Sequence, residues 1–259
     1  PAHGLSKGAD ASLFRLLMVL AMYQARRDRL IQDQQRSWDK DQSSEFLSLA
    51  LLRRSVNATQ CSCLTSPDDL HRACTVHKQA VTYLCAADIP ACPVISRARL
   101  WGRMAHLGKV PISSLQVLWQ KDGLATALKA ANSLDDPIDR LEFVIAKIAS
   151  VHGIGRKLAT LYVSALCTPA LAQGLTPWWP QLDGNLAVVI DTHATRAIRV
   201  LSGGIAGSSY QSQVDWLRGA ASDLDLTEWR SDLPRYSPRL VQQALYCYCS
   251  RSNREARHL

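Results

Sequence analysis

The sequence predicts an all-α protein, and two observations support this fold class. Apolar residues recur at helical spacing along most of the chain, and helix start signals precede several of these runs. A strand-like run occurs only from Leu186 to Ile190, between a Gly-Asn turn and a helix start, and we expect extended backbone there without a sheet. Helices packed against helices are therefore the predicted architecture.

The first helices are predicted from apolar stripes in the N-terminal part of the chain. One helix carries a stripe that consists of Leu13, Leu16, Leu17, Leu20 and Ala21. The next segment carries a stripe that consists of Phe46, Leu47, Ala50 and Leu51. Each set falls on one face at 3.6 residues per turn, so both faces are expected to be buried.

Two later helices have both a start signal and an apolar stripe. Asp136-Pro137 and Ser237-Pro238 each read as an N-cap followed by proline at the first helical position. The stripe of the earlier helix consists of Leu141, Val144, Ile145 and Ile148. The stripe of the later helix consists of Leu240, Val241, Ala244, Leu245 and Tyr248.

The composition is that of a globular protein with a basic surface. The 259 residues are 47% hydrophobic and 20% charged, which is enough to build one large domain or two lobes around a core. The net charge of +8 favours a polyanionic partner such as nucleic acid, although a basic surface without a specific partner has the same charge.

The cysteines and the longest apolar run indicate a compartment. The cysteines are Cys61, Cys63, Cys74, Cys85, Cys92, Cys167, Cys247 and Cys249. Four disulfides in a secreted protein are one reading, but a chain with an ample core favours reduced intracellular thiols, and no pair has the CxxC spacing of a zinc site. The apolar run from Leu13 to Tyr23 is interrupted by Arg15 and is too short to span a bilayer. We therefore expect an intracellular protein, in the cytoplasm, nucleoid or nucleus, with no membrane contact and no metal.

A helix, a tight turn and a second helix are predicted around the segment VHGIGRK, residues 151–157. Gly153 and Gly155 permit positive φ and let another backbone approach closely, and Ile154 is expected to anchor the turn in the core. The helix that follows presents unpaired N–H groups and the positive end of its dipole, which suits a DNA phosphate. A plain helix–helix turn with two glycines remains the alternative at this point.

A carboxylate at a helix start is the second motif. Asp191 lies between the apolar run 186–190 and a helix that carries Ile198 and Leu201, so it is predicted to be an N-cap. It follows Lys157 by 34 residues. Taken alone, Asp191 is interpreted as a cap and nothing more.

Together, VHGIGRK and VIDTHATRA resemble the helix-hairpin-helix DNA glycosylase superfamily, with the closest likeness to the endonuclease III branch. The likeness covers residues 151–166 and 188–200. It implies a two-lobed all-α fold with a DNA-binding cleft between the lobes. It also implies a base-excision enzyme with AP-lyase activity, in which Lys157 forms the Schiff base and Asp191 is the catalytic carboxylate.

The resemblance also implies the DNA contacts. Gly153, Ile154 and Gly155 would form the phosphate-binding hairpin, with Arg156 and Arg196 as further phosphate contacts. The hairpin carbonyls can hold a monovalent cation in this family. The partner would be double-stranded DNA that contains a damaged or modified base, and the protein is expected to be a monomer.

Several features depart from the family and leave the excised base open. Cys247 and Cys249 are too close together for the branch's four-cysteine motif, so we expect no iron–sulfur cluster. The substrate-pocket candidates are Arg53, Trp178 and Trp179, although both tryptophans also suit a role in pinning their loop to the core. A non-catalytic helix-hairpin-helix DNA-binding module, or a glycosidase that acts on a modified nucleoside or RNA, remain rival readings.

The expected organisation has four parts. Residues 1–43 form an N-terminal helical segment that joins the C-terminal lobe. Residues 44–167 form a helical barrel lobe that ends in the helix-hairpin-helix, and residues 168–187 form an insertion loop rich in proline and tryptophan. Residues 188–259 form the C-terminal helical lobe with the catalytic aspartate.

Overall fold

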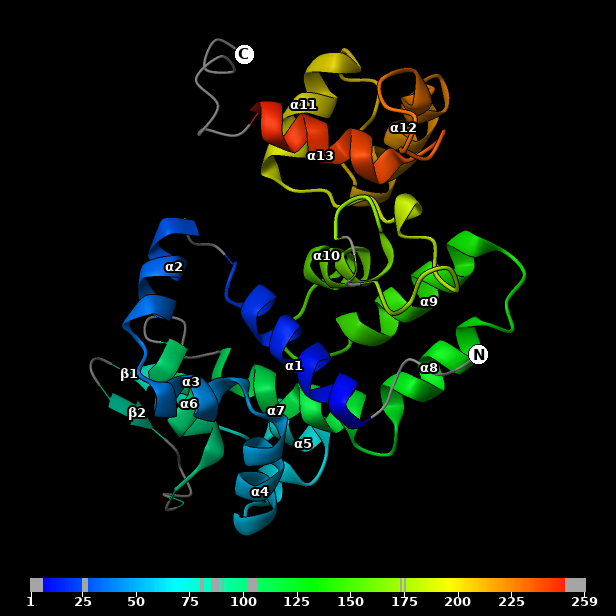
Figure 1. Ribbon diagram of the computed structural model, residues 1–259. Helices are drawn as coiled ribbons and strands as arrows, with labels where there is room; N and C mark the ends of the chain where they lie inside the picture. Colours follow the sequence, from blue (N-terminus) through cyan, green and yellow to red (C-terminus); the bar gives the residue numbers. More distant parts are fainter. Residues whose placement is uncertain are drawn as a thin grey trace. The chain divides into compact units, whose positions relative to one another are not determined.

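A computed structural model describes residues 7–24, 28–79, 82–84, 89, 91–101, 107–172, 174 and 176–249, and it is helical as the sequence predicts (Figure 1). The α-helices are α1 (Lys7–Ala21), α2 (Asp28–Ser37), α3 (Lys40–Leu47), α4 (Leu49–Ala58), α5 (Pro67–Arg72), α6 (Pro93–Trp101), α7 (Val110–Ser114), α8 (Gly123–Ala131), α9 (Pro137–Ala149), α10 (Arg156–Cys167), α11 (Thr192–Leu201), α12 (Tyr210–Ser222) and α13 (Pro238–Cys249).

Shorter elements connect the α-helices. They are the 3₁₀ turns η1 (Ser62–Leu64), η4 (Gly184–Leu186) and η5 (Leu226–Glu228) and the π-helical turn η3 (Leu115–Trp119). One antiparallel pair of short strands, β1 (His77–Gln79) and β2 (Thr82–Leu84), places Lys78 opposite Tyr83. The segment that follows η4 is extended and joins no sheet, as predicted. No helix in the described ranges is long and apolar enough to cross a membrane.

The chain divides into two compact units that differ from the predicted lobes. Unit 1 comprises Pro1–Ala130 and Ala146–Leu158, and unit 2 comprises Ala131–Ile145 and Ala159–Leu259. The N-terminal segment 1–43, which we expected to join the C-terminal lobe, belongs to unit 1, because α1 packs against α3, α4 and α7. Apolar periodicity identifies the face that a helix buries but does not identify the helices that cover it.

The core of unit 1 is built around the N-terminal helix. Phe14 of α1 is fully buried and meets the Trp119 ring edge-on, with the ring centroids 5.3 Å apart. The stripe predicted from Phe46 to Leu51 is correct only in part: Phe46 is buried, but Ser48 ends α3 and caps α4 through its hydroxyl, so the stripe is divided between two helices. The change of axis buries Leu49 and leaves Ala50 exposed.

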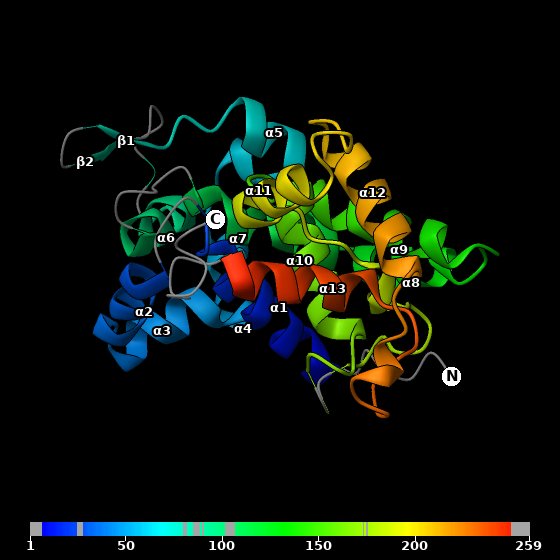
Figure 2. The ribbon, with the colours of Figure 1, turned by 90° about the horizontal axis from the view of Figure 1, so that it is seen from above.

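Unit 2 contains a bundle in which α11, α12 and α13 lie side by side (Figures 1 and 2). Its buried core consists of Val188, Ile190, Ile198, Ala206, Val214 and Leu217. The stripe predicted for α13 is correct only in part: Val241 and Leu245 pack on this core, whereas Ala244 and Tyr248 are exposed. The buried face of α13 instead carries two polar side chains, Arg239 and Gln242.

Both predicted proline-type helix starts are confirmed. The Asp136 carboxylate accepts hydrogen bonds from the backbone N–H groups of Ile138 and Asp139, and α9 begins at Pro137. The Ser237 hydroxyl accepts from the N–H of Leu240, and α13 begins at Pro238. The predicted stripe of α9 is buried along its whole length.

Candidate functional site

In the hairpin between α9 and α10, one of the two glycines has the positive φ that the sequence predicts. Gly153 has a φ of +75°, and a Cβ there would lie 2.9 Å from Cγ2 of Val110. Ile154 is 3% exposed and anchors the turn in the core of unit 1, as expected. A Cβ at Gly155 would meet no atom within 4 Å, so this position faces open space. The hairpin backbone therefore packs against the protein at Gly153 and faces open space at Gly155.

Three contacts within unit 1 hold this hairpin from different segments. The N–H of His152 donates to Oγ of Ser113 at 2.9 Å, and the Gln24 amide donates to the Gly153 carbonyl at 3.0 Å. The Nδ1 atoms of His71 and His152 lie 3.1 Å apart. Because these contacts come from α5, α7 and the segment after α1, the turn is fixed by tertiary structure as well as by its own residues.

The first turn of α10 carries the charged residues of the motif. Arg156 begins the helix, Lys157 follows it, and both side chains are exposed. The N-terminus of an α-helix attracts anions through its unpaired N–H groups and its dipole. An exposed turn with two cations at such a helix end suits a phosphodiester group.

The other predicted catalytic residue is an N-cap in unit 2, as the sequence indicates. Oδ1 of Asp191 accepts from the N–H of Ala194 at 2.7 Å, and the Asp191 side chain is half-buried. This bond ties the carboxylate to the first turn of α11. The Tyr210 hydroxyl donates to the carbonyl of Val188 at 3.1 Å and holds the extended segment that leads to Asp191.

A buried cation lies in the electrostatic neighbourhood of Asp191. Arg239 of α13 is 4% exposed, and burial lowers the pKa of its guanidinium to about 10, a shift that the negative charge of Asp191 opposes. Arg239 therefore carries its charge at neutral pH. Its Nε donates to Oγ of Ser164 at 2.7 Å, and its Nη1 donates to the amide oxygens of Gln242 and Gln243 at 2.6 and 3.0 Å.

The network around Arg239 was not predicted from the sequence. The spacing of its residues could have indicated it, because an arginine followed by glutamines three and four positions later shares one helix face with them. Apolar periodicity does not identify such a face, because polar residues are expected on the solvent side of a helix.

The two predicted catalytic residues fall in different units. Lys157 belongs to unit 1 and Asp191 to unit 2, and α10 is one continuous helix whose first turn lies in unit 1 and whose remainder lies in unit 2. Arg196 is exposed on α11, in unit 2 with Asp191. Unit 1 therefore carries a backbone hairpin with cations, and unit 2 carries a capped carboxylate.

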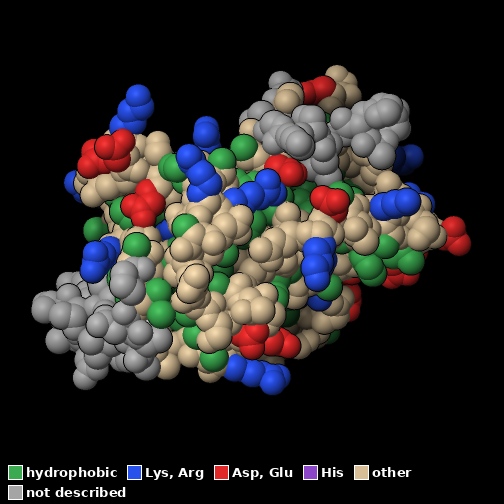
Figure 3. Space-filling view, turned by 90° about the horizontal axis from the view of Figure 1, so that it is seen from below, with side chains coloured by type: hydrophobic (Ala, Val, Ile, Leu, Met, Phe, Trp, Pro, Cys, Tyr) green, Lys and Arg blue, Asp and Glu red, His purple; other side chains and the backbone are tan. Residues whose placement is uncertain are grey.

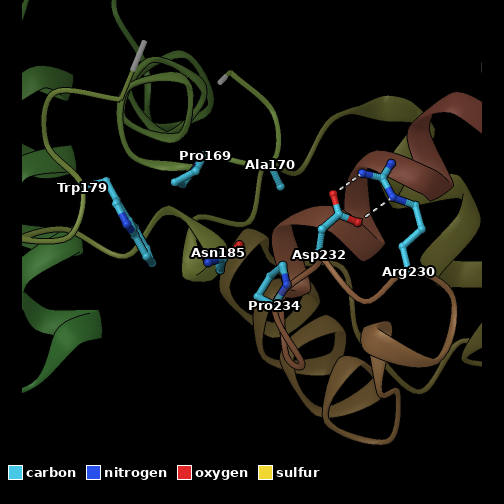
Figure 4. Close-up of a pocket in the computed structure, with 7 residues that line it drawn as sticks. All are labelled: Pro169, Ala170, Trp179, Asn185, Arg230, Asp232 and Pro234. Carbon is cyan, nitrogen blue, oxygen red and sulfur yellow. Dashed lines mark hydrogen bonds and ion pairs between the residues drawn. The ribbon is translucent and has the colours of Figure 1, made fainter. Parts of the chain in front are cut away.

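The two tryptophans of the insertion loop have separate roles. Trp178 is 3% exposed, meets Tyr162 of α10 edge-on and donates its backbone N–H to the Leu166 carbonyl, so it pins the loop to the core. Trp179 is 40% exposed and lines a cavity of about 370 Å³ within unit 2 (Figure 4). The cavity is lined by Pro169, Ala170, Trp179, Asn185, Arg230, Asp232 and Pro234.

The two charged residues that line this cavity form an ion pair with each other. Arg230 makes two hydrogen bonds with the Asp232 carboxylate, at 2.9 and 2.5 Å, and they lower the pKa of that carboxyl (Figure 4). The lining does not include Asp191. Of the predicted pocket residues, Trp179 alone faces this cavity; Arg53 belongs to unit 1, where it donates to the Trp119 carbonyl at 3.3 Å.

The surface charge is distributed and not gathered into one basic stripe on the face that Figure 3 shows. Lysine and arginine side chains alternate there with aspartate and glutamate. The net charge of +8 by itself therefore identifies no binding surface on this face.

The remaining groups that could be reactive or bind a metal are the cysteines and the other potential metal-ligating side chains. The seven cysteines of the described part are thiols and not disulfides, and Cys85 lies outside it. Burial raises the pKa of the Cys167 thiol, which favours its protonated form. Within the described ranges no group of three or more His, Cys, Asp or Glu side chains could hold a metal ion.

Comparisons of the chain with protein-family models, with curated proteins and with solved structures give no match. Function is therefore inferred from the two motifs and from the geometry around each of them.

Proposed function

We propose that the protein is a DNA base-excision glycosylase with AP-lyase activity, in which Lys157 and Asp191 act on the same nucleotide of double-stranded DNA. The observation that carries the proposal is the hairpin. A left-handed Gly153, a buried Ile154 and an open Gly155 lead directly into a helix N-terminus with exposed Arg156 and Lys157. This arrangement suits a phosphate and presents an amine beside it.

The chemistry follows from the two side chains. The neutral amine of Lys157 attacks C1′ of the target nucleotide, and the base leaves with the electron pair of the N-glycosidic bond and gains a proton. The Asp191 carboxylate stabilises the positive charge that develops on the sugar. Loss of a C2′ proton from the resulting Schiff base then breaks the bond to the 3′ phosphate, which nicks the strand and accounts for lyase activity.

The charge on Arg239 supports the role of Asp191. The buried guanidinium and the Asp191 carboxylate are near enough for their charges to interact. Asp191 also caps a helix N-terminus, which holds its carboxylate in a fixed orientation. A target base must also leave the stack to be reached.

Borohydride trapping on duplex DNA with an abasic site tests the proposal. The wild-type protein should form a covalent adduct that Lys157→Ala abolishes and that Lys129→Ala, an exposed lysine outside the motifs, retains. Absence of an adduct in the wild type would overturn the lyase activity. Duplex binding without any base release would then favour the non-catalytic DNA-binding module, and activity on free nucleosides without duplex affinity would favour the nucleoside glycosidase.

A further inference from the structure

A pair of imidazoles lies beside the hairpin and has no role in the proposed reaction. His71, near the end of α5, is exposed, and His152, the residue before Gly153, is half-buried. Their Nδ1 atoms are 3.1 Å apart, and the ring planes meet at 56° with centroids 5.3 Å apart. The pair joins residues 81 positions apart in sequence, and both belong to unit 1.

The separation of the two nitrogens matches that of two ligands on one metal ion. Zinc–imidazole bonds are about 2.0–2.1 Å long, so two of them at a tetrahedral angle place their nitrogens about 3.3 Å apart. Imidazole is also a ligand that first-row divalent metals share. We propose that His71 and His152 form a two-ligand site for zinc or a similar first-row divalent ion, which clamps α5 to the hairpin.

The proton balance of the proposed site is simple. In the neutral pair, one Nδ1–H donates to the other Nδ1, and the donor ring must change tautomer before both Nδ1 lone pairs can face the metal. The proton moves from Nδ1 to Nε2 of the same ring, so binding to the neutral pair releases no net proton. The exposed surroundings leave the remaining coordination positions to water or to a phosphate oxygen.

Metal binding would fix the position of the hairpin relative to α5. The hairpin is already tied to Ser113 and Gln24 through His152 N–H and the Gly153 carbonyl. A metal bridge would add a tie to α5 that is stronger than a neutral hydrogen bond. This inference does not depend on glycosylase activity, because it concerns the hairpin alone.

Titration of the full chain with zinc, followed by calorimetry, tests the site. Affinity for zinc should fall at least about tenfold in His71→Asn and in His152→Asn. Asparagine keeps a side-chain hydrogen-bonding group at each position but is a poor zinc ligand, so it separates metal binding from the hydrogen bond. His193→Asn, a change at an imidazole in unit 2, should retain wild-type affinity.

Two further readouts keep the test decisive if the cysteines also bind metal. Bound Co²⁺ should give visible bands without a thiolate charge-transfer band, and zinc should slow amide exchange at residues 151–155 in the wild type but not in His71→Asn. A thiolate band that persists in both histidine variants, or unchanged zinc affinity in both, would overturn the proposal.

Discussion

The hairpin of unit 1 and the aspartate cap of unit 2 prepare reactive groups in opposite ways. The hairpin depends on backbone geometry: Gly153 takes a left-handed φ, Ile154 is buried, and the cations that follow are exposed. The Asp191 region depends on side chains, since a buried Arg239 holds Ser164, Gln242 and Gln243 in one network close to the carboxylate. If the proposed function is correct, DNA binding and charge stabilisation should be separable by mutation.

The largest expected effect is on catalysis at the aspartate. Asp191→Asn should lower base release by about 10²–10⁴-fold, because the amide cannot stabilise positive charge on the sugar. Asparagine is as good an N-cap as aspartate, so the melting temperature should stay within about 2 °C of the wild type. Single-turnover base release and thermal melting measure the two effects.

Asp191→Ala is the matched control, because it should lose both the activity and the cap, the latter costing about 1 kcal/mol of unfolding free energy. Full activity in the asparagine variant would reduce Asp191 to a structural cap.

The next effect is on the stability of unit 2. Arg239→Met should lower the unfolding free energy by about 3 kcal/mol, because it leaves buried polar partners of the guanidinium unsatisfied. The same change at Arg230, whose ion pair with Asp232 is exposed, should lower the unfolding free energy far less. Urea denaturation measures both, and equal costs at the two positions would show that the buried network contributes little.

A smaller effect should separate folding from DNA binding within the hairpin. Gly153→Ala should cost about 2 kcal/mol, because the φ of +75° strains an L-residue and the new Cβ approaches Val110. Gly155→Ala has open space around its Cβ and should leave stability nearly unchanged, yet it should weaken duplex binding if a phosphate approaches there. Unfolding and fluorescence-anisotropy measurements compare the two, and normal duplex affinity in Gly155→Ala would place the phosphate elsewhere.

The smallest effect concerns single phosphate contacts. Arg156→Ala and Arg196→Ala should each reduce the slope of log affinity against log salt concentration by about 1. Arg36→Ala, at an exposed arginine outside both motifs, should leave the slope unchanged. A slope that no variant changes would indicate that these arginines do not contact phosphate.

The sequence by itself determined the features that depend on local chemistry. Caps at Asp136, Asp191 and Ser237 were predictable, because each needs only a short polar side chain before a helix. The helical class followed from apolar spacing. The burial of Ile154 was expected from its place between the two glycines of the hairpin.

Only the tertiary structure decided which segments meet. It assigned the N-terminal helix to unit 1, ended a helix at Ser48, separated the roles of Trp178 and Trp179, and buried Arg239. It also brought His71 to His152 across 81 positions. Local preferences set the periodicity of a segment, whereas its burial depends on partners distant in sequence, and a buried polar residue is stabilised only once those partners are in place.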